Sequence, residues 1–228
     1  MARQQIAVHV FMKIMLKLLG LLLIAVTFAA QTYAQSLQPP PVDKGSRYLI
    51  YLPGRIVQAG NTRPTSPKFG VYEYEQILAT FKQNGFKVIS EARDQSTDVE
   101  RYAATLADEI RALLIAGVPA KHITIVGASQ GSWIAMLTST YLQNRNVNFV
   151  LIAACSADPA FLKMVNLHGN VLSIYEKTDL AQSCVEYRKD ATGVRDWKEV
   201  EVNTGLKHGF LFRPLKEWAD PAIAWAKR

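Results

Sequence analysis

One short run constrains the fold of this chain more than any other. It reads ITIVGASQGSW over residues 123–133 and contains a Gly-x-Ser-x-Gly pentapeptide centred on Ser129. A β-branched pattern typical of a strand precedes the pentapeptide, and a helical pattern follows it. This context predicts a sharp strand-to-helix turn, where a strained backbone holds the serine side chain outward. Because a helix N-terminus favours nearby negative charge, the Ser129 hydroxyl is a candidate nucleophile.

The two glycines of the pentapeptide, Gly127 and Gly131, have a steric explanation. Neighbouring strands and the following helix crowd such a turn, and residues without a Cβ atom let the backbone pass.

Strand and helix patterns alternate along the rest of the chain. This alternation predicts an α/β fold with a mostly parallel central sheet of about six strands, flanked by helices on both faces. In such sheets, functional groups gather at the carboxyl ends of the strands. The expected strands are 47–52, 87–90, 122–126, 149–154, 171–175 and 197–202. The expected helices are 73–84, 97–115 (opened by a capping-box pattern at 97–100), 129–143, 158–165 and 215–227, and loops are expected over 53–72 and 179–196.

The first 34 residues have the pattern of a secretory signal peptide. Lys13 and Lys17 supply positive charge, residues 18–30 are almost wholly apolar, and small residues stand before the expected cleavage after Ala34. We therefore expect a periplasmic or secreted protein; an uncleaved membrane anchor is the alternative. A proline-rich linker is expected over 35–46, followed by one domain over 47–228 with no stable membrane span.

Charge and composition narrow the possible partners. The 228-residue chain has a net charge of +7 and is 49% hydrophobic. Removing residues 1–34 removes three basic residues and no acidic one, so the mature charge is +7 − 3 = +4. No cluster of basic residues interleaved with aromatics is present, so nucleic-acid binding is not expected. No metal or cofactor is expected either, because His and Cys residues are not clustered.

The chain has two cysteines, Cys155 and Cys184, and both lie in the mature part. Cys155 ends an expected strand, and Cys184 follows the end of the next one. In an oxidising compartment they can form one disulfide if those strands are neighbours. Two unpaired buried thiols are the alternative.

A serine nucleophile needs a base that accepts its proton, and the chain offers four histidines. His9 lies in the export segment. His122 begins a strand and His168 precedes one, so both lie at the wrong end of the sheet. His208 follows the last expected strand, at the end where Ser129 lies, and is the candidate base by elimination.

The base needs a third group that holds it in the correct tautomer. Asp179 follows the carboxyl end of the strand at 171–175, and its carboxylate is the first candidate. Asp158, after the preceding strand, is the rival. Glu176 is expected to form hydrogen bonds within the same loop as Asp179. Asp190 and Asp196 lie in a polar loop and are expected to be solvated.

The order Ser129, Asp179, His208 resembles that of the α/β-hydrolases. The resemblance covers 47–228 and depends on four matches: the GASQG turn, the Asp after a strand, the near-terminal His-Gly at 208–209, and the YLPGR segment at 51–55 after the first strand. It implies acyl transfer to the serine, followed by hydrolysis, and a small-molecule ester or acyl substrate.

The YLPGR segment resembles the oxyanion loop of this family. The backbone N–H of Gln130, directly after the nucleophile, is then one expected oxyanion donor. Pro53 stands where the family often has histidine, and proline has no N–H to donate. The second donor is therefore Gly54, Arg55 or Ile56, with Arg55 favoured by its position.

Two features depart from the family pattern. The first mature strand leads directly into the oxyanion loop, so the early antiparallel hairpin of many members is missing. The segment between the strand at 149–154 and Asp179 is too short for a cap insertion. The resemblance is thus to a minimal, capless serine esterase with an open site.

Two other functions compete with an exported ester hydrolase. One is a non-catalytic binding protein with the same fold. The other is a short-chain dehydrogenase-like nucleotide-binding protein, because VGASQGSW also resembles a glycine-rich turn that holds a pyrophosphate. Against the latter, two strand–helix units precede the turn, and the sequence contains no Tyr-x-x-x-Lys. Peptidase, thioesterase and amidase activities stay open beside esterase activity.

Overall fold

The computed structural model describes residues 42–155 and 159–228. The expected signal peptide, its cleavage after Ala34, most of the linker and Asp158 lie outside the described residues. Within the described part of the chain, none of the helices has both the length and the apolar character needed to span a membrane.

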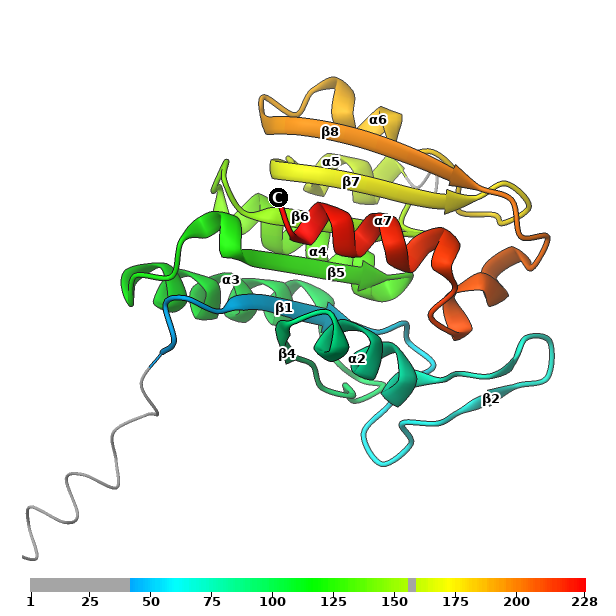
Figure 1. The fold of residues 1–228 in the computed structure, drawn as a ribbon. Helices are drawn as coiled ribbons and strands as arrows, with labels where there is room; N and C mark the ends of the chain where they lie inside the picture. Colours follow the sequence, from blue (N-terminus) through cyan, green and yellow to red (C-terminus); the bar gives the residue numbers. More distant parts are fainter. Residues whose placement is uncertain (1–41, 156–158) are drawn as a thin grey trace, which may run out of the picture. The chain divides into compact units, whose positions relative to one another are not determined.

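The central sheet has six strands, and all its neighbouring pairs are parallel (Figure 1). Their order across the sheet is β4-β1-β5-β6-β7-β8. This arrangement confirms the expected α/β class with a parallel sheet. The strands are β1 (Arg47–Leu52), β4 (Phe86–Ile89), β5 (Ile123–Ala128), β6 (Asn148–Ile152), β7 (His168–Glu176) and β8 (Gly193–Val202).

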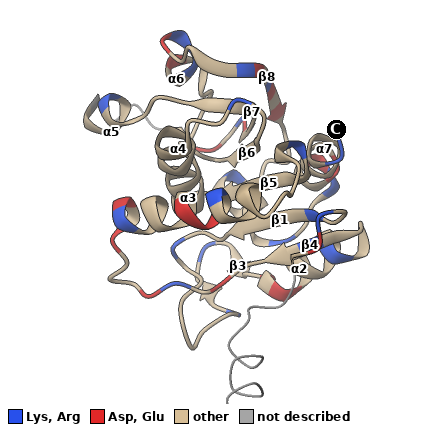
Figure 2. Ribbon diagram, turned by 90° about the vertical axis from the view of Figure 1, so that its left-hand side faces the viewer, with Lys and Arg blue, Asp and Glu red and all other residues tan. Residues whose placement is uncertain are grey.

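Helices cover both faces of the sheet (Figure 2). One face packs against α3 (Val99–Ile115) and α4 (Gln130–Leu142), and the other against α2 (Tyr74–Gln83) and α7 (Lys216–Ala226). In β1, Tyr48, Ile50 and Leu52 face the α3–α4 side, whereas Leu49 and Tyr51 face the other. Because successive strand side chains point to opposite faces, an apolar run such as RYLIYL fits a strand covered on both sides.

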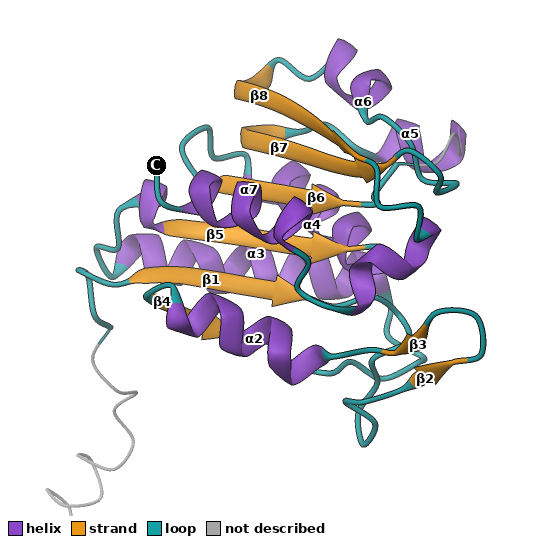
Figure 3. Ribbon diagram, turned by 45° about the vertical axis from the view of Figure 1, so that its right-hand side comes forward, coloured by secondary structure: helices purple, strands orange, loops and turns teal. Residues whose placement is uncertain are grey.

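Several short elements complete the described structure (Figure 3). Two of them modify the expectations from sequence. The stretch 53–72, expected as a loop, contains a small antiparallel ribbon, and the stretch 179–196 contains a helix and the first residues of β8. These elements are β2 (Thr65–Ser66), β3 (Gly70–Val71), η1 (Ala120–His122), α5 (Pro159–Met164), α6 (Val185–Lys189) and η2 (Lys207–Phe212).

Several element boundaries also differ from expectation by one to four residues, among them those of α3 and β7. The helix cap lies at Asp98, whose carboxylate accepts the backbone N–H groups of Glu100 and Arg101, so α3 begins one residue later than a cap at Thr97 would give. Strand β7 begins at His168, three residues before the expected strand. His168 therefore still lies at the amino end of the sheet, away from the candidate site.

The strand order places the carboxyl ends of β1 and β5 side by side, where the connectivity reverses direction across the sheet. In open parallel sheets, ligands bind at such a point. Leu52, the last residue of β1, pairs with Gly127 of β5. The segment after β1 and the turn at Ser129 therefore begin next to each other.

The glycines on either side of Ser129, Gly127 and Gly131, give the first testable prediction. A Cβ atom on Gly131 would lie 1.9 Å from the Leu52 carbonyl oxygen. The substitution Gly131→Ala therefore forces the start of α4 away from the end of β1. We expect a loss of roughly 3 kcal/mol or more in the free energy of unfolding, measured by urea denaturation. The matched control is Gly45→Ala, whose nearest neighbour is the Asp43 carboxylate at 3.4 Å and whose stability should change by less than about 0.5 kcal/mol. Equal stability of the two variants would contradict this packing.

Candidate active site

Ser129 occupies the turn between β5 and α4, in the conformation that the sequence predicts. Its backbone has φ 53° and ψ −120°, a left-handed conformation that non-glycine residues rarely adopt. Such strain costs about 1–3 kcal/mol and must be held in place by the surrounding structure. Here a Cβ atom on Gly127 would lie 2.4 Å from the Gly131 carbonyl oxygen, so glycine is required on both sides of the serine.

The nearby Ser132 is fully buried. Its hydroxyl lies 2.7 Å from the Gly127 carbonyl and 2.8 Å from the Ile152 carbonyl, and it accepts the N–H of Ile152 at 2.9 Å. The Ser132 hydroxyl therefore ties α4 to the ends of β5 and β6 and has a structural role.

The structure brings Ser129, His208 and Asp179 into one continuous hydrogen-bonded chain. The Nε2 atom of His208 lies 3.0 Å from the Ser129 Oγ atom, and its Nδ1 atom lies 2.7 Å from an Asp179 carboxylate oxygen. The other oxygen of Asp179 accepts the backbone N–H of Leu180 at 2.7 Å. The Asp179 side chain is 5% exposed and that of His208 is 34% exposed, so the acid is buried while the imidazole edge faces the pocket.

The other residues considered from sequence lie elsewhere. His122 ends η1 and His168 begins β7, both at the amino ends of strands. Asp190 follows α6 and is exposed. Asp196, on β8, forms an ion pair with Arg228.

Glu176, the last residue of β7, holds the loops that carry Asp179 and His208. It is fully buried. One of its carboxylate oxygens accepts the hydroxyl (2.7 Å) and the N–H (2.8 Å) of Thr204, and the other accepts the hydroxyl (3.1 Å) and the N–H (3.2 Å) of Thr178. Burial opposes ionisation, but these hydrogen bonds outweigh it and lower the pKa of Glu176. The carboxylate thus joins the residue before Asp179 to the loop before His208.

The N-terminus of α4 and the segment after β1 border the serine. The N–H of Gln130 is among the first of a helix, which lack intrahelical partners. A Cβ atom on Gly54 would lie 3.6 Å from the Ser129 Cβ atom, so this segment touches the nucleophile. Burial raises the pKa of the nearby Tyr72 hydroxyl to about 12, and its hydrogen bond with the Tyr51 hydroxyl at 2.7 Å opposes that rise.

Arg93 also holds this segment, and no local sequence pattern predicted that role. Its guanidinium is buried and donates from Nη2 to the Pro53 carbonyl at 2.5 Å, across 40 residues of sequence. The guanidinium carbon also lies 5.6 Å from the centre of the Tyr102 ring. Burial lowers the pKa of Arg93. A charged donor held in this position constrains where the backbone of 53–55 can go.

Ser129 and His208 open into a cavity of about 520 Å³. Its walls include the aromatic rings of Phe69 and Trp133, which the sequence analysis did not select. Phe69 lies in the turn between β2 and β3, and its ring centre is 6.5 Å from that of His208. Trp133 lies one turn after the nucleophile on α4, so its helical spacing from Ser129 was an available signal. The cavity thus combines apolar walls with the polar side chains of Ser129, His208 and Asp179.

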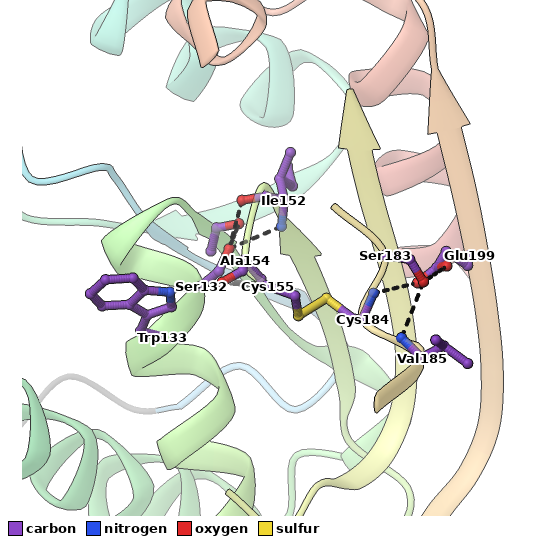
Figure 4. The surroundings of a disulfide bond; sticks show 10 residues. Ser132, Trp133, Ile152, Ala154, Cys155, Ser183, Cys184, Val185 and Glu199 are labelled. Carbon is purple, nitrogen blue, oxygen red and sulfur yellow. Dashed lines mark hydrogen bonds between the residues drawn. A yellow bond between two sulfur atoms is a disulfide. The ribbon is translucent and has the colours of Figure 1, made fainter. Parts of the chain in front are cut away.

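A disulfide joins Cys155, just after β6, to Cys184, just before α6 (Figure 4). The structure thus contains the first of the two cysteine states considered from sequence. Gln182 reinforces the link, because its backbone N–H donates to the Cys155 carbonyl at 3.1 Å and its side chain donates to the Asp179 carbonyl. The segment from Asp179 to Cys184 is therefore held at both ends.

Hydrogen bonds anchor both sides of this disulfide (Figure 4). On one side, the Trp133 indole N–H donates to the Ala154 carbonyl at 2.7 Å. On the other, the N–H of Cys184 donates to the Glu199 carboxylate on β8 at 2.9 Å. The nucleophile helix, the loop after β6 and the loop after β7 are thus connected around the cavity.

Removing the disulfide should lower stability measurably. The two cysteines are 29 residues apart, and closing a loop of that length is worth roughly 3–4 kcal/mol in the chain-entropy model. We expect Cys155→Ser/Cys184→Ser to lose about that much in the free energy of unfolding, measured by urea denaturation. Dithiothreitol should destabilise the wild type and leave the double variant unaffected. Equal stability of the oxidised wild type and the double variant would contradict the structure.

The Glu176 contacts predict a pH-dependent stability. Because the folded-state pKa lies below the ordinary value of 4.5, the stabilisation is present at neutral pH and is lost as the pH falls through the folded-state pKa. We expect Glu176→Gln to lower the free energy of unfolding by about 2 kcal/mol at pH 7 and by clearly less at pH 3. Urea denaturation at both pH values measures this difference. The control is Glu109→Gln, an exposed acid on α3; a loss for Glu176→Gln that is constant with pH would refute the assignment.

Comparisons with known proteins bear on the fold. No family model matches the sequence, and no curated protein matches it either. Solved structures do match. SOBER1 from Arabidopsis thaliana superposes with a TM-score of 0.55 at 12% identity, over 81% of this chain and 99% of that one. A metagenome-derived lipolytic enzyme, from a description of LipS and LipT, gives 0.51 at 11% identity, over 80% and 94%.

A third similar structure comes from Xanthomonas campestris pv. campestris and is described under the α/β superfamily of hydrolases. Its TM-score is 0.50 at 15% identity, and the match covers 79% of this chain and 96% of that one. At these identities the likeness concerns the fold, and it extends over nearly the whole length of each similar protein.

Proposed function

We propose that this chain, which has the α/β-hydrolase fold, is an exported serine hydrolase that cleaves carboxylic esters through an acyl-enzyme on Ser129. One observation carries the proposal. Ser129, His208 and Asp179 form an unbroken chain of contacts at 3.0 and 2.7 Å, beside a cavity open to substrate. This arrangement fits a catalytic triad: the strained serine at a helix N-terminus is the nucleophile, the imidazole is the base, and the buried carboxylate orients the base.

The first half of the reaction forms the acyl-enzyme. The Nε2 atom of His208 accepts the hydroxyl proton as the Ser129 Oγ atom attacks the ester carbonyl carbon. Asp179 accepts a hydrogen bond from Nδ1–H, which keeps Nε2 free to accept the proton and stabilises the imidazolium that forms. The N–H groups of Gln130 and Arg55 are the proposed donors to the oxyanion. When the tetrahedral species collapses, His208 gives its proton to the departing alcohol.

The second half releases the acid. Water enters the open cavity, His208 removes one of its protons, and the oxygen attacks the acyl carbon. The bond to Ser129 then breaks, and the serine oxygen recovers a proton from His208. Both halves use the same imidazole, so its contacts with both neighbours must persist through the cycle.

Two observations support export. Disulfides persist mainly in oxidising compartments, and the described residues contain one between Cys155 and Cys184. The N-terminal 34 residues have the composition of a signal peptide. Ester cleavage is supported by the apolar cavity walls, and one structure of similar fold belongs to lipolytic enzymes.

A fluorophosphonate probe distinguishes this proposal from a non-catalytic binding protein. We expect the wild type to be labelled covalently and to hydrolyse 4-nitrophenyl butyrate, and we expect Ser129→Ala to lose both properties. Intact-protein and peptide mass spectrometry locate the label. Folded wild type that takes no label and turns over no ester would support the binding protein instead.

Ser132→Ala is the matched control for this experiment. It should keep the label, because its hydroxyl bonds to the Gly127 and Ile152 backbone and not to His208. It should lose about 1–3 kcal/mol in the free energy of unfolding, since the Ile152 N–H is left without this acceptor. Labelling that depends on Ser132 and survives in Ser129→Ala would overturn the assignment of the nucleophile.

A further inference from the structure

Two lysines line the cavity beside the candidate triad, and the proposed reaction does not use them. Lys68 and Lys207 are both exposed. Neither forms an ion pair with any acid in the described ranges 42–155 and 159–228. Lys68 lies against the Phe69 ring, with its Nζ atom 5.2 Å from the ring centre.

The fold brings these two lysines to the same part of the cavity. Lys207 is the neighbour of His208, and Lys68 is the neighbour of Phe69. The Phe69 ring packs against the His208 ring, with centres 6.5 Å apart. A Cβ atom on Gly209 would lie 2.8 Å from the Phe69 ring. The Lys68 and Phe69 backbone N–H groups donate to the Ser66 hydroxyl, which fixes the turn that carries them. Both lysines therefore line the same cavity as the His208 imidazole, each next in sequence to one of the two packed rings.

The charge at this place differs from that on α3, α6 and β8. On α3, α6 and β8, basic and acidic residues occur together (Figure 2). Among the described residues that line the cavity, Asp179 is the one acid, and its oxygens bond to His208 and to the Leu180 N–H. Within the ranges 42–155 and 159–228, the cavity lining thus carries two positive charges that no lining acid pairs with. Such a site attracts anions.

The chemistry of the proposed reaction determines which half of the ester substrate lies beside these lysines. In forming the acyl-enzyme, the imidazole must protonate the departing alcohol oxygen, so the alcohol half lies next to His208. We propose that Lys68 and Lys207 bind a negatively charged group on the alcohol half of the ester; this inference rests on the proposed function. The preferred substrate class is therefore an ester of an anionic alcohol with an apolar acid.

The charged group takes no part in bond changes. The Ser129 Oγ–acyl bond forms, the acyl–alkoxy bond breaks, and the serine proton passes through His208 to the alcohol oxygen. The product alcohol leaves with its anionic group unchanged. Binding by exposed lysines is weakened by salt, so the preference should decrease as ionic strength rises.

Three butyrate esters of phenols test this proposal. The phenols carry, in the para position, a carboxymethyl group (anionic), a carbamoylmethyl group (neutral) or an aminoethyl group (cationic). In each, at least one methylene separates the variable group from the ring, so the phenols leave with similar intrinsic ease. Released phenol is quantified by liquid chromatography. We expect kcat/KM to be about tenfold higher for the anionic ester than for the neutral one at low salt, and lowest for the cationic ester.

Charge-removing variants assign the preference to the two lysines. In Lys68→Gln/Lys207→Gln, the anionic-to-neutral ratio should fall close to one. The control Lys82→Gln/Lys121→Gln removes the same charge from exposed positions on α2 and η1, away from the cavity, and should keep the ratio. A ratio retained in the first variant, or lost equally in both, would overturn the proposal.

The outcome separates this inference from the proposed function. Equal kcat/KM for the three esters, with hydrolysis that still depends on Ser129, would refute the anionic substrate and leave the serine hydrolase intact. Absence of hydrolysis for all three, together with absence of fluorophosphonate labelling, would refute the proposed function itself.

Discussion

Close backbone contact between the turn at Ser129 and the end of β1 determines where the nucleophile lies. Gly131 packs so tightly against the Leu52 carbonyl that no side chain fits between them, and Gly127 packs as tightly against the first turn of α4. Because β1 and β5 are adjacent parallel strands, the same contact brings the segment at 53–55 alongside the serine. The nucleophile, its helix N-terminus and the proposed oxyanion loop therefore depend on one packing arrangement. The positive φ at Ser129 is the conformational cost of that arrangement.

Buried polar groups hold the surrounding loops. Glu176 connects the loop of Asp179 to the loop of His208 through two threonines, and Arg93 holds the Pro53 carbonyl beneath the oxyanion loop. The Cys155–Cys184 disulfide fixes the far end of the loop that begins at Asp179. Loops held in this way keep the candidate catalytic groups within hydrogen-bonding distance, although the loops are not themselves helices or strands. The cavity itself is left open, which suits the missing cap insertion expected from sequence.

Much of this arrangement was predictable from sequence because it depends on local patterns. The strand–turn–helix around Ser129 has its own signature, and the rule that parallel strands end at one edge led to Asp179 and His208. What the sequence could not predict depends on contacts between distant segments. Arg93 meets Pro53 only because β4 lies beside β1 in the sheet. Phe69 reaches His208 because it lies on a ribbon whose strands have two residues each, and helix α6 has five residues. Elements this short show no hydrophobic periodicity in the sequence.

In the proposed reaction, an imidazole held by a buried carboxylate activates the half-buried Ser129 hydroxyl, so that His208 and Ser129 act as one unit. The most direct measurement is kcat for 4-nitrophenyl butyrate in Ser129→Ala, His208→Ala and the double variant, each shown to be folded. We expect either single change to lower kcat by roughly 10⁴-fold or more, and the double variant to be no worse than the singles. Substantial turnover in His208→Ala, or losses that multiply in the double variant, would contradict it.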